Sequence, residues 1–222
     1  LIERLQKHAP IPQEGVLRRA VFRESVPKGK DDKEGAIYGV MDLQDYDPIF
    51  TKLLFYEPLI FSIKEVLGTR LKLHHTRLIT KGADLNKAVG EGSDFGMHQD
   101  YPFFPHRYHS TLAAWIPLID TSLENGTLHV VPGSHKLGPI EHSGSPENGF
   151  RLNQDEWPIS RGIPVIAKAR DVILFNYLMV HGSNQNKSNK QRTALIYQFN
   201  ASTDEPLNSA HHDSSGNGML LM

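Results

Sequence analysis

The segment GMHQDYPFFPHRYH, residues 96–109, places three histidines, one aspartate and four aromatic residues within fourteen positions. Its H-x-D pair, His98 and Asp100, could hold a metal ion, because residues i and i+2 of a β-strand point to the same face. Such a short pair is weak evidence alone. A second H-x-D pair, His211 and Asp213, lies in the glycine- and serine-rich run HHDSSGNG. We expect no strand to position those side chains, so we interpret that copy as accidental.

A third metal ligand and an anion-binding residue follow in the C-terminal part of the chain. We expect His181 to end an apolar strand within ILFNYLMVH, and Arg192 to begin another strand eleven residues later. Two imidazoles and one carboxylate occupy one face of an octahedral ion and leave three positions open, as expected of non-haem iron(II) oxygenases. A guanidinium at position 192 could form two hydrogen bonds with the distal carboxylate of a dicarboxylate ligand. Taken alone, the polar residues beside Arg192 favour a surface arginine instead.

The composition excludes several classes of protein. The chain has 222 residues, of which 39% are hydrophobic and 22% charged, so it can bury a core and fits one domain. Its formal net charge of −1 argues against a nucleic-acid partner. We find no apolar run long enough for a membrane span and no secretory leader. The absence of cysteine excludes disulfide scaffolds and thiol nucleophiles and suits a reducing cytosol, so we expect a cytoplasmic protein of undetermined oligomeric state.

The elements that must position these residues are helices first and strands afterwards. Proline follows Asp47 and Glu57, which predicts two helix starts, and Gly68 predicts a helix end. We therefore expect a helical part over about 1–69, with an exposed loop at 27–35. From residue 70 the apolar period changes to two, which predicts a β core over about 70–200 and a tail at 201–222. The expected strands cover 70–80, 111–119, 127–131, 163–167, 171–176 and 192–199. Together these patterns predict an α+β chain with a β-sandwich or jelly-roll core.

The first expected strand, RLKLHHTRLIT, also carries polar side chains that the apolar pattern does not explain. His74 and His75 are adjacent, so strand alternation predicts that only one of them faces the interior. We consider His75 and Arg77 as residues that could touch a co-substrate or substrate. The long segments at about 81–95 and 136–162 are expected to be binding loops or lids.

Four stretches together carry a family resemblance. They are MHQD (97–100), ENGTLHVVPGSHK (124–136), HGSNQN (181–186) and QRTALIYQFN (191–200). Over roughly residues 70–200 the chain resembles the phytanoyl-CoA dioxygenase family of Fe(II)/2-oxoglutarate-dependent oxygenases. The resemblance implies a double-stranded β-helix (jelly roll, cupin-like) core with N-terminal helices packed on one sheet, so that 1–222 forms a single oxygenase domain.

The same resemblance implies roles for individual residues. It makes His98, Asp100 and His181 the catalytic iron(II) ligands, with 2-oxoglutarate as co-substrate and O2 as the oxidant. It implies that Arg192 binds the far carboxylate of 2-oxoglutarate with Ser183 beside it. Two further residues complete the implied co-substrate site: Trp115 matches a strand position that lines the pocket, and Lys81 resembles a lysine that reaches the co-substrate in some members.

The remaining histidines of the matched region receive structural interpretations. His106 and His109 follow the metal-binding pair among aromatic residues, and we interpret them as a packed loop over the barrel mouth. The alternative is that some of these side chains line the substrate pocket. We take His129 and His135 as structural, or in the case of His135 as a neighbour of the ligands, because a fourth imidazole would remove an open position from the iron.

The expected activity is hydroxylation of an unactivated C–H bond in a small molecule, with release of succinate and CO2. Desaturation, cyclisation and epoxidation use the same ligands and remain alternatives, and a substrate of specialised metabolism is our preference. Two hypotheses from other classes compete with an enzyme. One is a non-catalytic cupin-like metal- or ligand-binding protein, and the other is a β-sandwich interaction module without metal.

Overall fold

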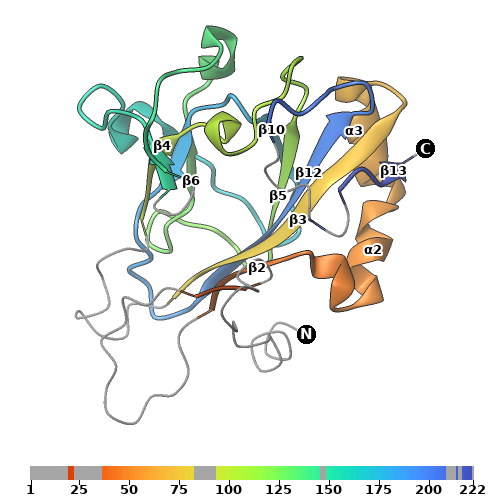
Figure 1. The fold of residues 1–222 in the computed structure, drawn as a ribbon. Helices are drawn as coiled ribbons and strands as arrows, with labels where there is room; N and C mark the ends of the chain where they lie inside the picture. Colours follow the sequence, from red (N-terminus) through yellow and green to blue (C-terminus); the bar gives the residue numbers. More distant parts are fainter. Residues whose placement is uncertain are drawn as a thin grey trace.

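Two antiparallel β-sheets face each other in the computed structural model, which describes residues 20–22, 37–82, 94–145, 149–208, 214 and 217–221. Two helices cover the outer face of the larger sheet, so the described chain forms three layers (Figure 1). The larger sheet has the strand order β1-β2-β3-β12-β5-β10 with β13 beside β3, and the smaller has the order β4-β11-β6-β9. This arrangement confirms the predicted α+β class with a jelly-roll core and helices packed on one sheet.

The larger sheet consists of β1 (Ala20–Phe22), β2 (Ile37–Met41), β3 (Leu71–Lys81), β5 (Leu112–Pro117), β10 (Ile173–Asn176), β12 (Arg192–Ala201) and β13 (Leu220–Leu221). The smaller sheet consists of β4 (Phe95–His98), β6 (Leu128–Val130), β9 (Ile163–Pro164) and β11 (His181–Ser183), and a separate hairpin pairs β7 (Ser143–Ser145) with β8 (Gly149–Arg151). The short 3-10 helices are η1 (Leu43–Asp45), η2 (Tyr101–Phe103), η3 (Ser134–Leu137) and η4 (Ile159–Arg161).

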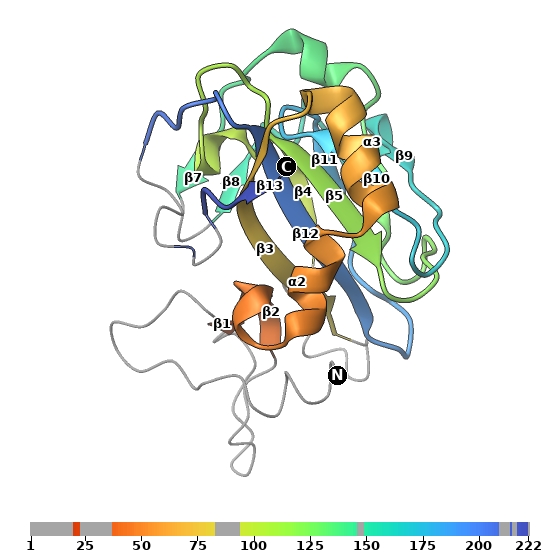
Figure 2. The same ribbon diagram turned by 90° about the vertical axis from the view of Figure 1, so that its right-hand side faces the viewer.

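Both predicted helix starts are confirmed. Helix α2 (Pro48–Leu54) has proline at its first position, and the Asp47 side chain accepts a hydrogen bond from the Ile49 N–H at 2.9 Å. Helix α3 (Glu57–Leu67) ends at Gly68, whose φ of 90° favours glycine because a side chain would strain the backbone there. Figure 2 shows the two helices lying across the outer face of the larger sheet.

Each face of the larger sheet has its own core, because alternate residues of a strand point to opposite sides. On the outer face, buried side chains of α2 and α3 pack against one set of strand residues, including Leu78, Leu195 and Tyr197. On the inner face, Ala113, Trp115 and Ala194 pack towards the smaller sheet. The inner face is the one that can contribute side chains to a site between the sheets.

A β-bulge on β3 changes the expected orientation of the two adjacent histidines. Gln198 pairs with His75, but the next residue, Phe199, pairs with Leu73, so His74 is an extra residue on β3. Both imidazoles are buried, at 3% and 4% exposure, and their Nδ1 atoms lie 2.7 Å apart. The prediction that only one of them faces the interior was therefore wrong, because strand alternation does not hold across a bulge.

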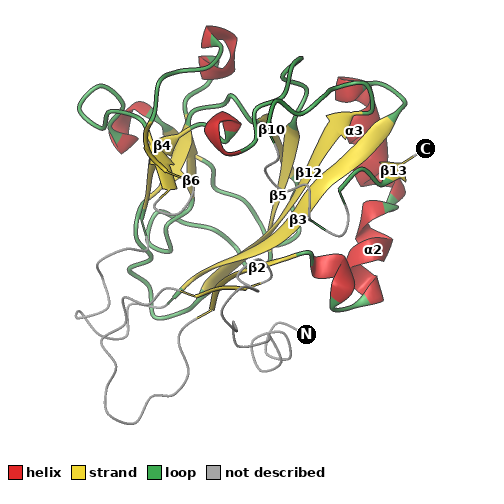
Figure 3. Cartoon of the chain, in the orientation of Figure 1, coloured by secondary structure: helices red, strands yellow, loops and turns green. Residues whose placement is uncertain are grey.

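Two other boundaries differ from the sequence prediction, as the colours of Figure 3 make visible. The region expected to be helical over about 1–69 contains β1 and β2, and β2 extends the sheet by pairing with β3. The expected tail at 201–222 returns to the sheet as β13. In both cases short segments form strands because a neighbouring strand supplies their hydrogen-bond partners. The expected strand at 163–167 is only two residues long, and the long segment 136–162 contains the end of η3, the β7–β8 hairpin and η4.

Some sequence expectations lie outside the described residues. These are the exposed loop at 27–35, most of the loop at 81–95, and the second H-x-D pair at His211 and Asp213. Within the described part of the chain, the helices are all too short or too polar to cross a membrane.

Asp204 fixes the segment that leads from the smaller sheet back to β5. Its carboxylate accepts hydrogen bonds from the Tyr108 N–H, the Ser110 N–H and the Ser110 hydroxyl, at 2.7–2.9 Å. Burial raises the pKa of Asp204, but these hydrogen bonds outweigh it and hold the pKa below its ordinary value. The buried carboxylate therefore stabilises this segment in its ionised form.

Candidate metal centre

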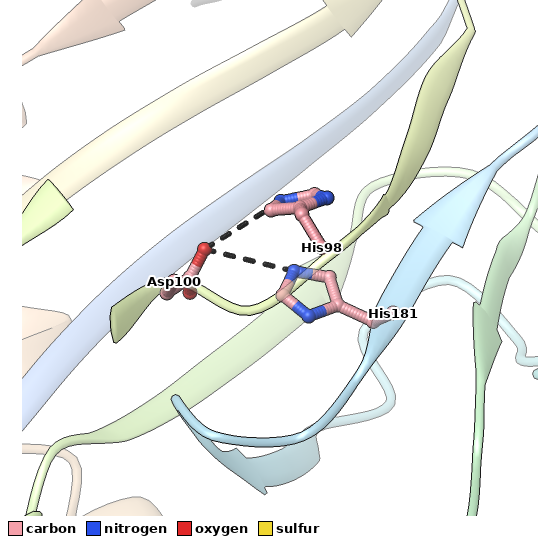
Figure 4. Close-up of side chains that lie close together, drawn as sticks. All are labelled: His98, Asp100 and His181. Carbon is pink, nitrogen blue, oxygen red and sulfur yellow. Dashed lines mark ion pairs between the residues drawn. The ribbon is translucent and has the colours of Figure 1, made fainter. Parts of the chain in front are cut away.

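Three potential ligand atoms converge between the two sheets. His98, Asp100 and His181 each offer one ligand atom, and these atoms all lie within 4.8 Å of one another. Oδ1 of Asp100 lies 3.7 Å from His98 Nε2 and 3.6 Å from His181 Nε2 (Figure 4). These separations exceed hydrogen-bonding distance, whereas one ion between the three atoms could be bound by all of them.

Strand pairing explains why the two histidines meet. His98 ends β4 and His181 begins β11, and the two residues are directly opposite each other in the antiparallel ladder. Their ring centroids lie 4.3 Å apart. Gly182 allows this close pairing, because a Cβ atom there would lie 2.7 Å from the Phe95 carbonyl oxygen and 2.8 Å from Met97 Sδ. The glycine of the HGS stretch is therefore needed for the approach of β4 to β11.

Backbone carbonyls set the tautomer of both imidazoles. The Nδ1 atom of His98 lies 2.8 Å from the Gly96 oxygen, and that of His181 lies 2.8 Å from the Met179 oxygen. A carbonyl oxygen can only accept, so Nδ1 carries a proton in both rings, and Nε2 is the nitrogen left on the side of Asp100 to bind a metal. Burial, with a contribution from the neighbouring His181, holds the pKa of His98 well below its usual range. His98 is therefore neutral, which is the form that binds metals.

The positions of Asp100 and His181 in the fold differ from the sequence prediction. Asp100 does not lie on the same strand as His98, because β4 ends at His98 and Asp100 precedes η2 with helical backbone angles. A hydrogen bond from the Asp100 N–H to the backbone carbonyl oxygen of Tyr177, 2.9 Å long, holds this turn. His181 does not end an apolar strand, because the run before it divides between β10 and a turn and His181 begins a new strand in the other sheet. The three residues still converge, because β4 pairs with β11 and the turn after β4 brings Asp100 back towards the two imidazoles.

Gln198, which the sequence pattern did not single out, binds the second carboxylate oxygen of Asp100. Its Nε2 donates to Asp100 Oδ2 at 2.9 Å, and its side chain is 3% exposed. It lies on β12 six residues after Arg192, an even spacing that places both side chains on the same face of the strand. This even spacing from Arg192 was the feature of the sequence that could have identified Gln198.

Gln99 and His142 were also missed, and their hydrogen bonds hold the segment from His98 to Asp100 in place. Gln99 is fully buried and donates to the oxygens of Gly138 and Leu178 while accepting from the Ile140 N–H. His142 accepts the Gln99 N–H at Nε2 and donates from Nδ1 to the Ile140 oxygen. Burial lowers the pKa of His142, which keeps the ring in the neutral form that these two bonds require.

The four predicted co-substrate residues lie on strands that border the three converging residues. Arg192 on β12 is directly opposite Lys81 on β3, and the two side chains are 3% and 0% exposed. Arg192 donates to the Gly126 oxygen at 2.8 Å, and its guanidinium carbon lies 5.6 Å from the centre of the Trp115 ring. The Nζ atom of Lys81 donates to the backbone carbonyl oxygen of Asn184 and lies 5.3 Å from the centre of the Phe95 ring. The surface-arginine interpretation of Arg192 was wrong.

Ser183 completes this group. It is the last residue of β11, 5% exposed, and lies two residues after His181. Gly126 occupies the neighbouring turn with a φ of 71°, and a Cβ atom there would lie 2.5 Å from the Asn184 oxygen. The turn around Gly126 therefore packs directly against the segment that follows His181. In this arrangement the backbone oxygen of Gly126 accepts the hydrogen bond from Arg192.

The other histidines that the sequence singled out make local contacts. His106 is buried at 2% exposure, with Nδ1 2.9 Å from the Phe104 oxygen and its ring centroid 5.3 Å from that of His74. His109 lies 2.8 Å from the Tyr177 hydroxyl through its Nδ1. These contacts fit the packed-loop interpretation.

His129 and His135 lie in and after β6. His129 is buried, and its Nδ1 lies 3.2 Å from the Thr127 oxygen, in agreement with a structural role. His135 lies on η3, and its Nδ1 is buried without a hydrogen-bond partner among the described residues. Neither belongs to the set of three converging ligand atoms.

Comparison with known proteins agrees with this geometry. The family model described as phytanoyl-CoA dioxygenase (PhyH) matches residues 31–194. The peroxisomal phytanoyl-CoA dioxygenase of Homo sapiens is 31% identical over 177 residues, which cover 77% of this chain and 51% of the relative. A probable alpha-ketoglutarate-dependent hypophosphite dioxygenase of Stutzerimonas stutzeri is 27% identical over 168 residues, with 73% and 56% covered. The chain spans about half the length of the curated relatives it matches.

A solved structure shows the same fold. The epimerase SnoN in complex with Fe3+, alpha ketoglutarate and nogalamycin RO matches with a TM-score of 0.65 at 21% identity, covering 91% of this chain and 72% of that one. At this identity the likeness concerns the fold, and it agrees with the double-stranded β-helix described above.

Proposed function

The chain belongs to the phytanoyl-CoA dioxygenase family of 2-oxoglutarate-dependent non-haem iron dioxygenases, and we propose that it hydroxylates an unactivated C–H bond of a small molecule. The observation that carries this proposal is the convergence of His98, Asp100 and His181. Iron(II) and 2-oxoglutarate, when bound, supply the oxidation: O2 is consumed, succinate and CO2 are released, and one oxygen atom enters the substrate.

The three converging residues fit a divalent iron ion in donor type and charge. His98 and His181 would bind it through Nε2, because their Nδ1 protons are engaged by backbone carbonyls. Asp100 would bind it through Oδ1, the oxygen that faces both imidazoles. Two neutral imidazoles and one carboxylate leave a net positive charge on the bound ion, which favours an anionic co-substrate in the open positions.

The buried cations beside this site fit the distal carboxylate of 2-oxoglutarate. Arg192 would bind it through its guanidinium, with Lys81 directly across the strand pair adding a second positive charge. Burial strengthens such a charge pair, since little water competes with it. Trp115 would cover one side of the co-substrate, and the Ser183 hydroxyl would donate to it. These roles are consistent with the low exposure of all four side chains.

Aromatic side chains beside Asp100 would contact the substrate. Tyr101 and Phe103 follow Asp100 on η2, and the Phe103 ring packs edge-on against Phe150 of the β7–β8 hairpin, with centroids 4.9 Å apart. All three rings are partly exposed and offer an apolar surface near the metal-binding residues. An apolar contact next to the reacting position would orient a substrate carbon and exclude water.

We propose a substrate from specialised metabolism. The names of the two relatives differ widely in substrate, an acyl-CoA in one and hypophosphite in the other, so the family does not fix it. The precedent for this proposal is a protein of the same fold, since SnoN is described as an epimerase from nogalamycin biosynthesis. We also propose that 1–222 acts as one oxygenase domain. The cytoplasmic location stays a prediction, because the name of the human relative places that enzyme in the peroxisome.

The experiment measures succinate formed from 2-oxoglutarate with Fe(II) and O2, first alone and then with a panel of candidate small molecules. We expect succinate release that Asp100→Ala abolishes and that the exposed control Asp155→Ala retains. With a true substrate the product gains one oxygen atom, whereas loss of two hydrogens would indicate desaturation. Succinate release by the parent protein that does not exceed the release by Asp100→Ala would contradict the proposal. If both stay at the level of a protein-free control, a non-catalytic metal-binding protein would be favoured.

A further inference from the structure

Gln198 holds one oxygen of Asp100 from the opposite sheet. Its Nε2 donates to Oδ2 at 2.9 Å, while Oδ1 of the same carboxylate faces the Nε2 atoms of His98 and His181. The two carboxylate oxygens therefore have different partners. One is engaged by an amide N–H, and the other points to the place where the three ligand atoms converge.

We propose that Gln198 is a positioning residue that keeps Asp100 a monodentate ligand, an inference that rests on the proposed iron site. A carboxylate can bind a metal through one oxygen or through both. With one oxygen from Asp100, three of six positions stay open, as a chelating 2-oxoglutarate and O2 together require. With both oxygens bound, one of these positions is lost. To bind through both oxygens, the carboxylate of Asp100 would have to rotate so that Oδ2 also faces the metal. The hydrogen bond from Gln198 to Oδ2 opposes this rotation, because the bond would have to break.

The chemistry of the amide supports this role. An ionised carboxylate only accepts hydrogen bonds, so the amide must present its N–H end to Oδ2. Its Oε1 is then buried without a hydrogen-bond partner among the described residues. A buried polar atom without a partner is destabilising, and an apolar side chain of similar size would avoid it. Stability therefore does not explain a glutamine at this position, whereas an N–H aimed at Asp100 does.

The surrounding strands give the amide room and a fixed direction. On one side Gln198 is opposite Ala113 of β5, a small residue that leaves space for it. On the other side it is opposite His75, where the bulge at His74 begins. A bulge increases the local twist and redirects side chains, and bulges are frequent beside active sites. The His75 ring packs edge-on against Phe104, with centroids 5.5 Å apart, which fixes that flank.

The test compares Gln198→Met, which keeps the size but removes the donor, with Gln198→His, whose ring N–H restores one. Asn200→Leu is the matched control, because Asn200 is equally buried on β12 but donates to Thr111 Oγ1 at 3.0 Å. Each protein is loaded anaerobically with Fe(II). The infrared bands of 13C-carboxyl-labelled aspartate report the binding mode, since the splitting of the two carboxylate stretches narrows when both oxygens bind. Calorimetry measures affinity for Fe(II) and then for 2-oxoglutarate.

We expect Gln198→Met to bind Fe(II), to show the narrowed splitting, and to bind 2-oxoglutarate at least about tenfold more weakly. The loss of an outer partner of a metal ligand lowers metal affinity or activity by a factor of this size. Gln198→His should restore the wide splitting and much of the affinity. Asn200→Leu should behave as the parent. Parent-like splitting and 2-oxoglutarate affinity in Gln198→Met would overturn the inference while leaving the iron site intact, as would equal changes in Asn200→Leu. A parent protein that binds no Fe(II) would instead overturn the proposed function, and this inference with it.

Discussion

Replacing Arg192 by leucine removes the cation that we place against the distal carboxylate of 2-oxoglutarate. Arg192 is 3% exposed, so the charge pair would form with little water around it. Truncating one partner of such a buried pair costs about 2–5 kcal/mol. Lys81, directly opposite on β3, retains one positive charge and places the expected loss in the lower part of that range. A loss of about 2–3 kcal/mol raises the dissociation constant of 2-oxoglutarate roughly 30- to 150-fold.

The assay is anaerobic calorimetric titration of 2-oxoglutarate into the Fe(II)-loaded protein. Fe(II) affinity, measured first, should change little, because Arg192 is not among the three converging residues. Arg161→Leu is the control for losing an arginine, since Arg161 is exposed and its guanidinium carbon lies 4.2 Å from the centre of the Trp157 ring. A 2-oxoglutarate affinity for Arg192→Leu equal to that of the parent would refute the reasoning and remove Arg192 from the site.

Three further predictions concern the metal ligands and the residues that hold the fold around them. His98→Ala or His181→Ala should abolish turnover and sharply weaken Fe(II) binding, while His211→Ala should do neither; equal loss of iron in His211→Ala would mean that the wrong H-x-D pair was chosen. Gln99→Leu removes the three side-chain hydrogen bonds that hold the segment from His98 to Asp100, and it should lower the free energy of unfolding by about 2–4 kcal/mol in urea titrations. An unchanged unfolding midpoint would argue against this stabilising role of Gln99. The folded-state pKa of Asp204 lies below its unfolded value of about 3.9, so the stabilising effect of this carboxylate is present above that pH and is lost as the pH falls through the folded pKa. Asp204→Asn should therefore flatten the dependence of the free energy of unfolding on pH in acid. An unaltered slope would contradict this role of Asp204.

The sequence predicted which residues come together better than it predicted their local geometry. His98, Asp100 and His181 converge as expected, yet the strand argument for the H-x-D pair was wrong, since Asp100 lies in a turn. Convergence depends on the pairing of β4 with β11, which is a contact between distant segments. Motif spacing indicates such a contact only through resemblance to a family, because the period of a single strand carries no information about its neighbour.

The bulge at His74 and the role of Gln198 could not be predicted from local pattern. A bulge is set by the register between β3 and β12, and adjacent histidines on an ideal strand would point to opposite faces. Gln198 was detectable as the same-face neighbour of Arg192 at an even spacing, but its partner Asp100 lies in the turn after β4, a strand of the other sheet. Strands β1 and β2 were missed for a related reason: short strands at the margin of a sheet are stabilised by their neighbours more than by their own sequence.

The central claim is that His98, Asp100 and His181 hold an iron ion that 2-oxoglutarate chelates. The most direct measurement is visible absorption during anaerobic addition of Fe(II) and then 2-oxoglutarate, because the chelate has a charge-transfer band that neither component shows alone. We predict that the band appears in the parent protein with one equivalent of each and is absent in His181→Ala. A parent protein that binds Fe(II) but develops no such band with 2-oxoglutarate would contradict the account.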